Sequence, residues 1–96
     1  MSELRVVATI PTDPEAGDAV RAGLTELVEA TRAEDGCLAY EAFESTATPG
    51  VFVTIESWRS QEDLDAHMTT PHIAKAFETL GGVLTGDVAI HPLTAI

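Results

Sequence analysis

The sequence predicts an α+β fold of the ferredoxin-like type, a βαββαβ plait in which helices cover one face of a four-stranded antiparallel sheet. Three observations support this prediction. Four segments rich in Val, Ile, Phe and Thr are bounded by turn residues and are typical of strands. Longer segments after the first and third strands carry apolar residues at helical spacing. A chain of 96 residues accommodates one core, so residues 1–96 are expected to form a single domain.

The first half of the chain is predicted to contain a strand, a helix and a hairpin. Residues 4–10 (LRVVATI) stop at a proline and form the first expected strand. Residues 12–14 (TDP) then offer a helix cap, and apolar residues recur at helical spacing to about Glu34. Two strands separated by a hairpin-length loop follow at residues 37–45 and 51–59.

The second half is predicted to add two helices and a last strand. Ser60 begins an acidic variant of the capping box and starts a short helix. Thr70 and Pro71 start the next helix, whose apolar spacing continues to Leu84. Residues 88–93 (VAIHPL) form the last expected strand, and their proline favours a position at the edge of the sheet.

The third expected strand has apolar residues on both faces, which predicts a homodimer. Alternate positions of a strand point to opposite faces, which here separates Val51, Val53 and Ile55 from Phe52, Thr54 and Trp58. The helices of one protomer cover only one face. A second copy is the expected cover for the other face, giving a dimeric α/β barrel. The alternation alone leaves open which set meets the partner.

Composition limits the possible partners and the compartment. Five Lys and Arg residues against sixteen Asp and Glu residues give a formal net charge of −11, which disfavours binding to nucleic acids and to membrane surfaces. No apolar run approaches the roughly 18 residues needed to span a bilayer. The N-terminal MSELRVV segment lacks the pattern of a secretory signal, and Cys37 has no disulfide partner, so a cytoplasmic location is expected.

Two histidines are the candidate proton-transfer groups. His67 shares the inward face of the short helix, where it is either a core histidine bonded to a backbone carbonyl or a general base in an apolar cleft. His72 falls near the start of the next helix, where the helix dipole disfavours the imidazolium form. It is either the base or a surface residue, and we expect His67 to matter more.

Four further residues are candidates for a substrate-binding pocket. Glu56 and Trp58 share one face of their strand, and an inward Glu56 needs a partner, which Arg59, a histidine or a backbone amide could provide. Structural pairing and catalysis are both open for Glu56. Trp58 and Tyr40 either line an aromatic slot or close the core, and Phe77 is first of all expected in the core.

No metal or cofactor site is predicted. Metal binding by His67 and His72 needs a third ligand and a shared face, and a five-residue spacing across a proline suggests neither. The chain has no glycine-rich phosphate loop, no dinucleotide-binding fingerprint and no C-x-x-C motif. Cys37 lacks an adjacent basic group that would make its thiol reactive.

Three motifs, in this order and spacing, resemble the antibiotic biosynthesis monooxygenase family. They are E-D-G-C-L-A-Y at residues 34–40, I-E-S-W at residues 55–58 and D-A-H-M-T-T-P-H at residues 65–72. The resemblance covers nearly the whole chain and is closest to the quinol monooxygenase branch. It implies a dimeric ferredoxin-like barrel with a pocket between the sheet and the helices of each subunit.

The resemblance also implies a reaction. It suggests oxidation of a quinol or polycyclic phenol by dioxygen without a cofactor, with a histidine as general base and His67, His72, Trp58 and Tyr40 as the candidate residues. The haem-degrading branch is disfavoured, because the chain has no Asn and because Phe77 aligns with that branch's haem-ligating histidine. The alternative is a binding or accessory module that holds a small aromatic ligand in the same cleft without converting it.

Overall fold

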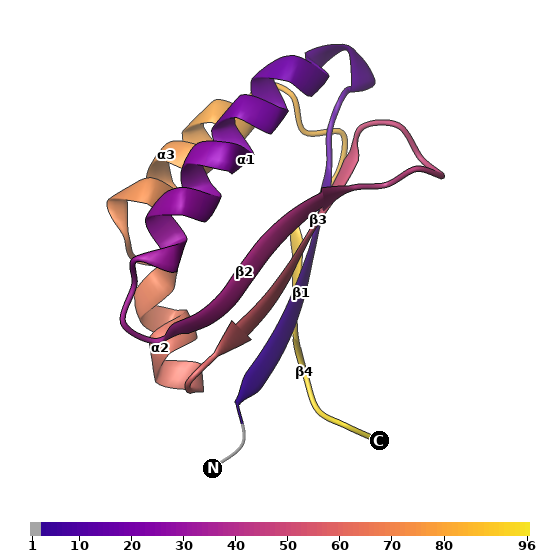
Figure 1. The fold of residues 1–96 in the computed structure, drawn as a ribbon. Coiled ribbons are helices and arrows are strands. Elements are labelled where there is room, and N and C mark those ends of the chain that lie inside the picture. Colours follow the sequence, from indigo (N-terminus) through magenta and orange to yellow (C-terminus); the bar gives the residue numbers. More distant parts are fainter. Residues whose placement is uncertain (1–2) are drawn as a thin grey trace.

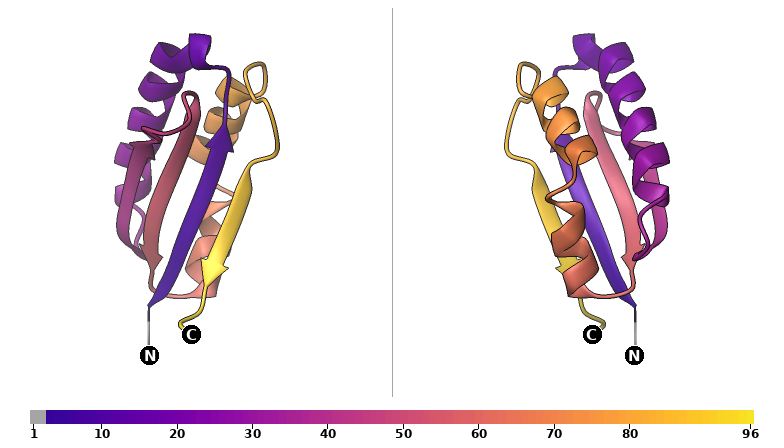
Figure 2. Two further views of the ribbon diagram at one scale, coloured as in Figure 1. Left: turned by 90° about the vertical axis from the view of Figure 1, so that its right-hand side faces the viewer. Right: turned by 90° about the vertical axis from the view of Figure 1, so that its left-hand side faces the viewer.

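The structure is a computed structural model that describes residues 3–96. Its elements in chain order are β1 (Leu4–Pro11), the 3-10 turn η1 (Pro14–Ala16), α1 (Gly17–Arg32), β2 (Cys37–Glu44), β3 (Val51–Trp58), α2 (Gln61–His67), α3 (Pro71–Leu80) and β4 (Ala89–Leu93) (Figure 1). The strands form one antiparallel sheet in the order β2-β3-β1-β4. The helices all lie on one face of this sheet (Figure 2). The predicted ferredoxin-like plait is therefore confirmed.

The helix boundaries differ from the sequence prediction at several points. Asp13 caps the η1 turn by accepting a hydrogen bond from the Glu15 amide at 3.0 Å, and α1 begins only after this turn. Helix α3 ends at Leu80, so Leu84 lies beyond the helix, in an isolated β-bridge with Thr12, although its spacing suits the helix. Among residues 3–96, no helix is both long enough and apolar enough to cross a membrane.

The hydrophobic core lies between the helices and one face of the sheet. Its largest contributions come from β1, α1, β3 and α3, through Val6, Ile10, Val20, Leu24, Leu27, Phe52, Trp58, Ile73 and Leu80. In β3, the set containing Phe52 and Trp58 faces the helices, and the set containing Val53 and Ile55 faces away from them. Ile55 remains 37% exposed, so the uncovered face of the sheet carries apolar side chains.

The end of the sheet beside the β2–β3 turn is held by backbone hydrogen bonds. The Gly50 carbonyl accepts from the Thr12 amide at 2.8 Å and from the Thr12 hydroxyl at 2.6 Å. Gly50 has a φ of 87°, and a Cβ atom there would lie 2.3 Å from the Thr12 carbonyl oxygen, so a glycine is required. The Asp13 amide also donates to Val83 and the Thr85 amide to Pro11. Helix α2 lies at the opposite end of the molecule (Figure 1).

Candidate active site: a glutamate between two histidines

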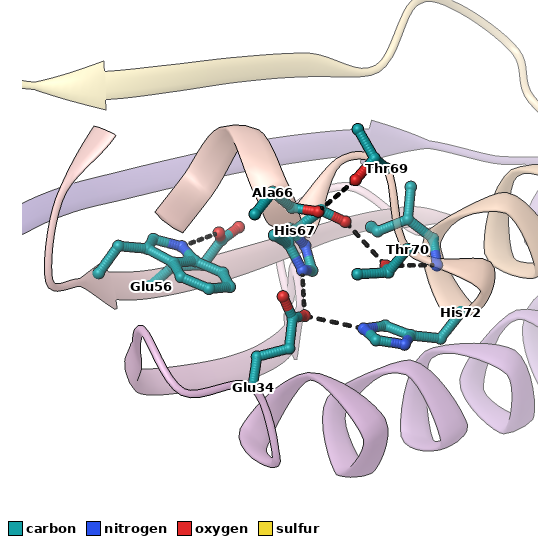
Figure 3. A network of polar contacts seen from close by, with 9 residues as sticks. Glu34, Glu56, Ala66, His67, Thr69, Thr70 and His72 are labelled. Carbon is teal, nitrogen blue, oxygen red and sulfur yellow. Dashed lines mark hydrogen bonds and ion pairs between the residues drawn. The ribbon is translucent and has the colours of Figure 1, made fainter. Parts of the chain in front are cut away.

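The corner between α2 and α3 places the two candidate histidines. The Ser60 hydroxyl caps α2 by accepting from the Asp63 amide, and the Thr70 hydroxyl caps α3 by accepting from the Ile73 amide. Both predicted caps are therefore confirmed. Since α2 ends at His67 and α3 begins four residues later, the chain turns sharply between the two rings. The Thr70 hydroxyl also donates to the His67 carbonyl at 2.7 Å, which secures this corner (Figure 3).

Both imidazole rings contact a single carboxylate oxygen. Glu34 follows the C-terminal end of α1, and its Oε2 lies 2.6 Å from Nδ1 of His67 and 2.8 Å from Nε2 of His72 (Figure 3). The side chain of His67 is 2% exposed, that of Glu34 is 16% and that of His72 is 23%. The three groups therefore form a row from the interior of the protein towards the solvent.

The geometric reason given against a shared site for the two histidines is wrong. On one straight helix, two residues five positions apart would point in different directions. Here the chain bends between α2 and α3, and this bend turns the rings of His67 and His72 towards Glu34. Glu34 was not predicted as a site residue. Its only signal in the sequence is its position at the start of the E-D-G-C-L-A-Y motif.

The contacts of Glu34 determine which nitrogen of His67 can accept a proton. An ionised carboxylate can only accept hydrogen bonds, so the ring nitrogen that faces it carries the proton. This arrangement assigns the hydrogen of neutral His67 to Nδ1 and leaves a lone pair on Nε2. No hydrogen bond within residues 3–96 engages Nε2, and the ring forms part of a cavity wall. Within the described residues, the lone pair on Nε2 of His67 is therefore free of a protein partner.

Glu56 is buried beside this row and has partners that the sequence analysis did not anticipate. Its side chain accepts from Nε1 of Trp58 at 2.8 Å and from the Thr54 hydroxyl at 2.6 Å, and the residue is only 4% exposed. Among residues 3–96, neither Arg59 nor a histidine nor a backbone amide donates to Glu56, and Arg59 instead forms an ion pair with Asp63 at 2.9 Å. Thr54, Glu56 and Trp58 alternate along β3 and share its helix-facing side.

Aromatic side chains enclose the His67 ring. The Trp58 ring centroid lies 4.6 Å from that of His67, with an interplanar angle of 42°, and the Tyr40 centroid lies 5.5 Å from it. Burial raises the pKa of the Tyr40 hydroxyl, the Glu56 charge raises it further, and a hydrogen bond with Thr54 acts in the opposite direction. Tyr40 therefore remains a neutral phenol that can donate a hydrogen bond.

An apolar cavity of about 40 Å³ lies between the sheet and the helices. Its walls include four of the predicted site residues, namely Tyr40, Glu56, His67 and Phe77. The other two do not line it: Trp58 is fully buried behind the His67 ring, and His72 lies on the side of α3 that faces α1. Phe77 is 38% exposed, so its expected place in the core is wrong.

The fold and this row of groups define a small α+β protein with a buried histidine–carboxylate cluster beside an apolar cavity. The description "Antibiotic biosynthesis monooxygenase" belongs to the family that matches residues 4–79. The chain belongs to this family of monooxygenases.

Individual relatives agree with this assignment. The chain is 38% identical over 95 residues to the Mycobacterium tuberculosis protein named "Putative monooxygenase Rv0793". This match covers 99% of this chain and 93% of that protein. It is 31% identical over 81 residues to "Putative monooxygenase YcnE" of Bacillus subtilis, covering 80% of this chain and 85% of that protein. A crystal structure described as an antibiotic biosynthesis monooxygenase matches with a TM-score of 0.91 and 36% identity, covering 97% of this chain and 98% of that one.

Proposed function

We propose that the protein is a cofactor-independent monooxygenase that oxidises a quinol or a related polycyclic phenol with dioxygen, and that His67 is the general base. The observation that carries this proposal is the geometry of His67. Glu34 fixes its Nδ1, and the free Nε2 belongs to a ring that lines an apolar cavity. A base with this arrangement accepts a phenolic proton and becomes an imidazolium ion, which the Glu34 carboxylate stabilises.

The electrons for the reaction come from the substrate. A phenolate transfers one electron to dioxygen, and recombination of the resulting radicals forms the carbon–oxygen bond. Cleavage of the O–O bond leaves one oxygen atom on the substrate, while the other leaves as water with two hydrogens that the substrate has lost. His67 transfers the proton that it accepted from the phenol to the departing oxygen. The neutral imidazole is thereby regenerated, and no net proton is released. The reaction needs a base, an apolar pocket and polar groups that stabilise the anion.

The cavity walls support an aromatic substrate, which requires the cavity to widen. A volume of about 40 Å³ holds little more than one or two water molecules. Several apolar residues of α2, α3 and the corner between them line the cavity. Of these, Met68 and Phe77 are not fully buried. We propose that their displacement admits the substrate and that the Tyr40 hydroxyl donates a hydrogen bond to it.

We also propose that the protein is a homodimer in which two sheets meet face to face. The sheet face opposite the helices carries Phe43, Val53 and Ile55, and Phe43 and Ile55 are 46% and 37% exposed. Phe43 lies directly across from Val53 in the pairing of β2 with β3. An apolar surface of this kind is usually covered by another molecule, and a second copy covers it symmetrically.

Oxygen uptake with a panel of reduced quinones, corrected for autoxidation, tests the proposed reaction. Incorporation of one atom from ¹⁸O₂ into the product distinguishes oxygenation from simple oxidation. His67→Ala should lower the rate by roughly 100-fold or more if this ring transfers the proton, and His72→Ala should have a smaller effect.

His91→Ala is the matched control, because His91 is exposed on β4 and outside the site. His91 lies across from Val7 on the sheet face proposed for the dimer, so this variant must also keep the wild-type mass in sedimentation. Full activity in His67→Ala would overturn the assignment of the base. Absence of an enzyme-dependent rate across the panel, combined with saturable binding of the same compounds, would instead favour a module that binds aromatic ligands without converting them.

A further inference from the structure

We propose that Glu34, His67 and His72 also bind a divalent transition-metal ion, and that this ion switches off His67 as a base. The first part rests on the site alone, and the second part rests on the proposed function. One ligand atom from each of the three residues lies within 4.8 Å of the other two. Two imidazole nitrogens and one carboxylate oxygen are a donor set that Zn²⁺ and Co²⁺ bind in proteins.

The three donors come from different elements, which makes the site part of the fold. Glu34 lies just beyond α1, His67 ends α2 and His72 is the second residue of α3. The backbone corner between α2 and α3 fixes both histidines, and Glu34 approaches them from the opposite side (Figure 3). An ion therefore meets donors that folding has already gathered, which reduces the entropic cost of binding.

The site is accessible, and the charge of the protein favours cations. The side chains of Glu34 and His72 are 16% and 23% exposed, so an ion can approach from the solvent. The net charge of −11 raises the local concentration of cations. Lys75, the one Lys or Arg residue of α3, forms an ion pair with Glu26 at 2.7 Å and not with Glu34.

Binding requires a modest rearrangement. The O···N distances of 2.6 and 2.8 Å are hydrogen-bond lengths, whereas two ligands each about 2.1 Å from one ion are about 3.0–3.4 Å apart. Glu34 Oε2 must therefore withdraw by several tenths of an ångström, and the two nitrogens must approach each other if they stand at the upper limit of 4.8 Å. Rotation of the partly exposed Glu34 and His72 side chains can supply both movements.

The bound ion would change the tautomer of His67. A metal ion takes the lone pair of Nδ1, so the ring hydrogen must reside on Nε2. Nε2 then presents an N–H group to the cavity in place of a lone pair. The ring keeps one hydrogen throughout, and no proton is lost from the protein. A metal-bound His67 can donate a hydrogen bond to a phenol but cannot deprotonate it.

Calorimetric titration of the chelator-treated, full-length protein with Zn²⁺ tests the site. We expect one ion per chain, and Co²⁺ should give visible absorption bands typical of a protein-bound ion. Glu34→Gln and His72→Gln should each weaken Zn²⁺ binding by at least 10-fold, and His91→Gln should not. In the wild-type protein, ¹⁵N NMR should show the His67 hydrogen moving from Nδ1 to Nε2 on addition of Zn²⁺, a readout that does not depend on any variant folding.

Binding that is equally strong in His72→Gln, or a His67 tautomer that Zn²⁺ does not change, would overturn the proposal. The inhibition step has its own test. If the protein oxidises quinols, Zn²⁺ should inhibit it with a midpoint equal to the calorimetric dissociation constant. If no substrate is oxidised, the calorimetric and NMR results still decide whether the metal site exists, so failure of the proposed function is distinguishable from failure of this inference.

Discussion

Trp58 is predicted to stabilise the fold through its ring nitrogen as well as through its bulk. Its Nε1 donates to Oε1 of Glu56 at 2.8 Å, and Trp58 is fully buried. Trp58→Phe retains an aromatic ring but removes this donor, so one oxygen of a buried carboxyl group loses its partner. Water cannot easily replace the donor, because Glu56 is only 4% exposed.

The expected cost follows from these contacts. A hydrogen bond to a charged group contributes about 1.5–3 kcal/mol, and loss of the larger ring adds a small void. We therefore expect Trp58→Phe to lower the free energy of unfolding by about 2–4 kcal/mol. For a domain of this size, a loss of about 2 kcal/mol corresponds to a decrease in Tm of about 8 °C or more.

Urea unfolding at one fixed protein concentration measures this free energy, because the proposed dimer would unfold in a concentration-dependent way. A double-mutant cycle with Glu56→Gln isolates the part of this cost that depends on the charge of Glu56. In the Glu56→Gln background the charge is absent, so Trp58→Phe should cost about 1–1.5 kcal/mol less. An equal cost of Trp58→Phe in both backgrounds would show that the charge of Glu56 does not contribute to the effect.

Three further substitutions test other parts of the structure. Ile55→Asp should dissociate the proposed dimer, because an unpaired carboxylate in an interface costs several kcal/mol. Sedimentation should then give the monomer mass. The control Ala74→Asp, on the exposed surface of α3, should keep the wild-type mass. Thr31→Val should raise the stability by about 1 kcal/mol in thermal unfolding, because the Thr31 hydroxyl is buried and has no hydrogen-bond partner within residues 3–96. A loss of stability would indicate an unrecognised partner. The hydrogen bond from Arg59, followed by that from Ser60, lowers the pKa of Asp63. Asp63 therefore stabilises the fold above its unfolded-state pKa and loses this effect as the pH falls through its folded-state pKa. Asp63→Asn should accordingly lower the urea midpoint at neutral pH and have little effect in strong acid, and an equal decrease at both pH values would contradict the charge-based explanation.

The order of elements and the helix caps could be predicted because they depend on local chemistry. The hydroxyls of Ser60 and Thr70 each cap the amide three residues later. The sequence pattern of a cap therefore lies within one turn of helix. The alternation along β3 likewise separates the two faces of the sheet. The end of α3 could not be placed, because the apolar spacing continues through Leu84 although two glycines interrupt the helix at residues 81 and 82.

The site was only partly predictable, because its central contacts join distant residues. Glu34 is 33 residues from His67 and 38 residues from His72, and only the packing of α1 beside α3 brings them together. Phe77 follows the apolar spacing of α3, yet it lies at the exposed side of the cavity. The spacing identifies a broad apolar face of the helix but does not show where that face meets the solvent. The partners of Glu56 follow from strand alternation, since Thr54 and Trp58 lie two residues away on the same face.

The two ends of the molecule are held by different kinds of bonds, and this difference has a consequence for how it opens. At one end, Gly50 binds Thr12 through two hydrogen bonds within the network of backbone bonds beside the β2–β3 turn. At the other end, the Arg59 amide donates to the Gly36 carbonyl, but the short helix α2 and the corner that follows it are tied to the end of α1 through the side chain of Glu34. Local unfolding should therefore begin at the α2–α3 corner, and amide hydrogens of α2 should exchange faster than those of β1. Because the same Glu34 contacts orient His67, an opening of this corner would also release the ring from its orientation. If His67 is the base that we propose, proton abstraction would then require the corner to close again.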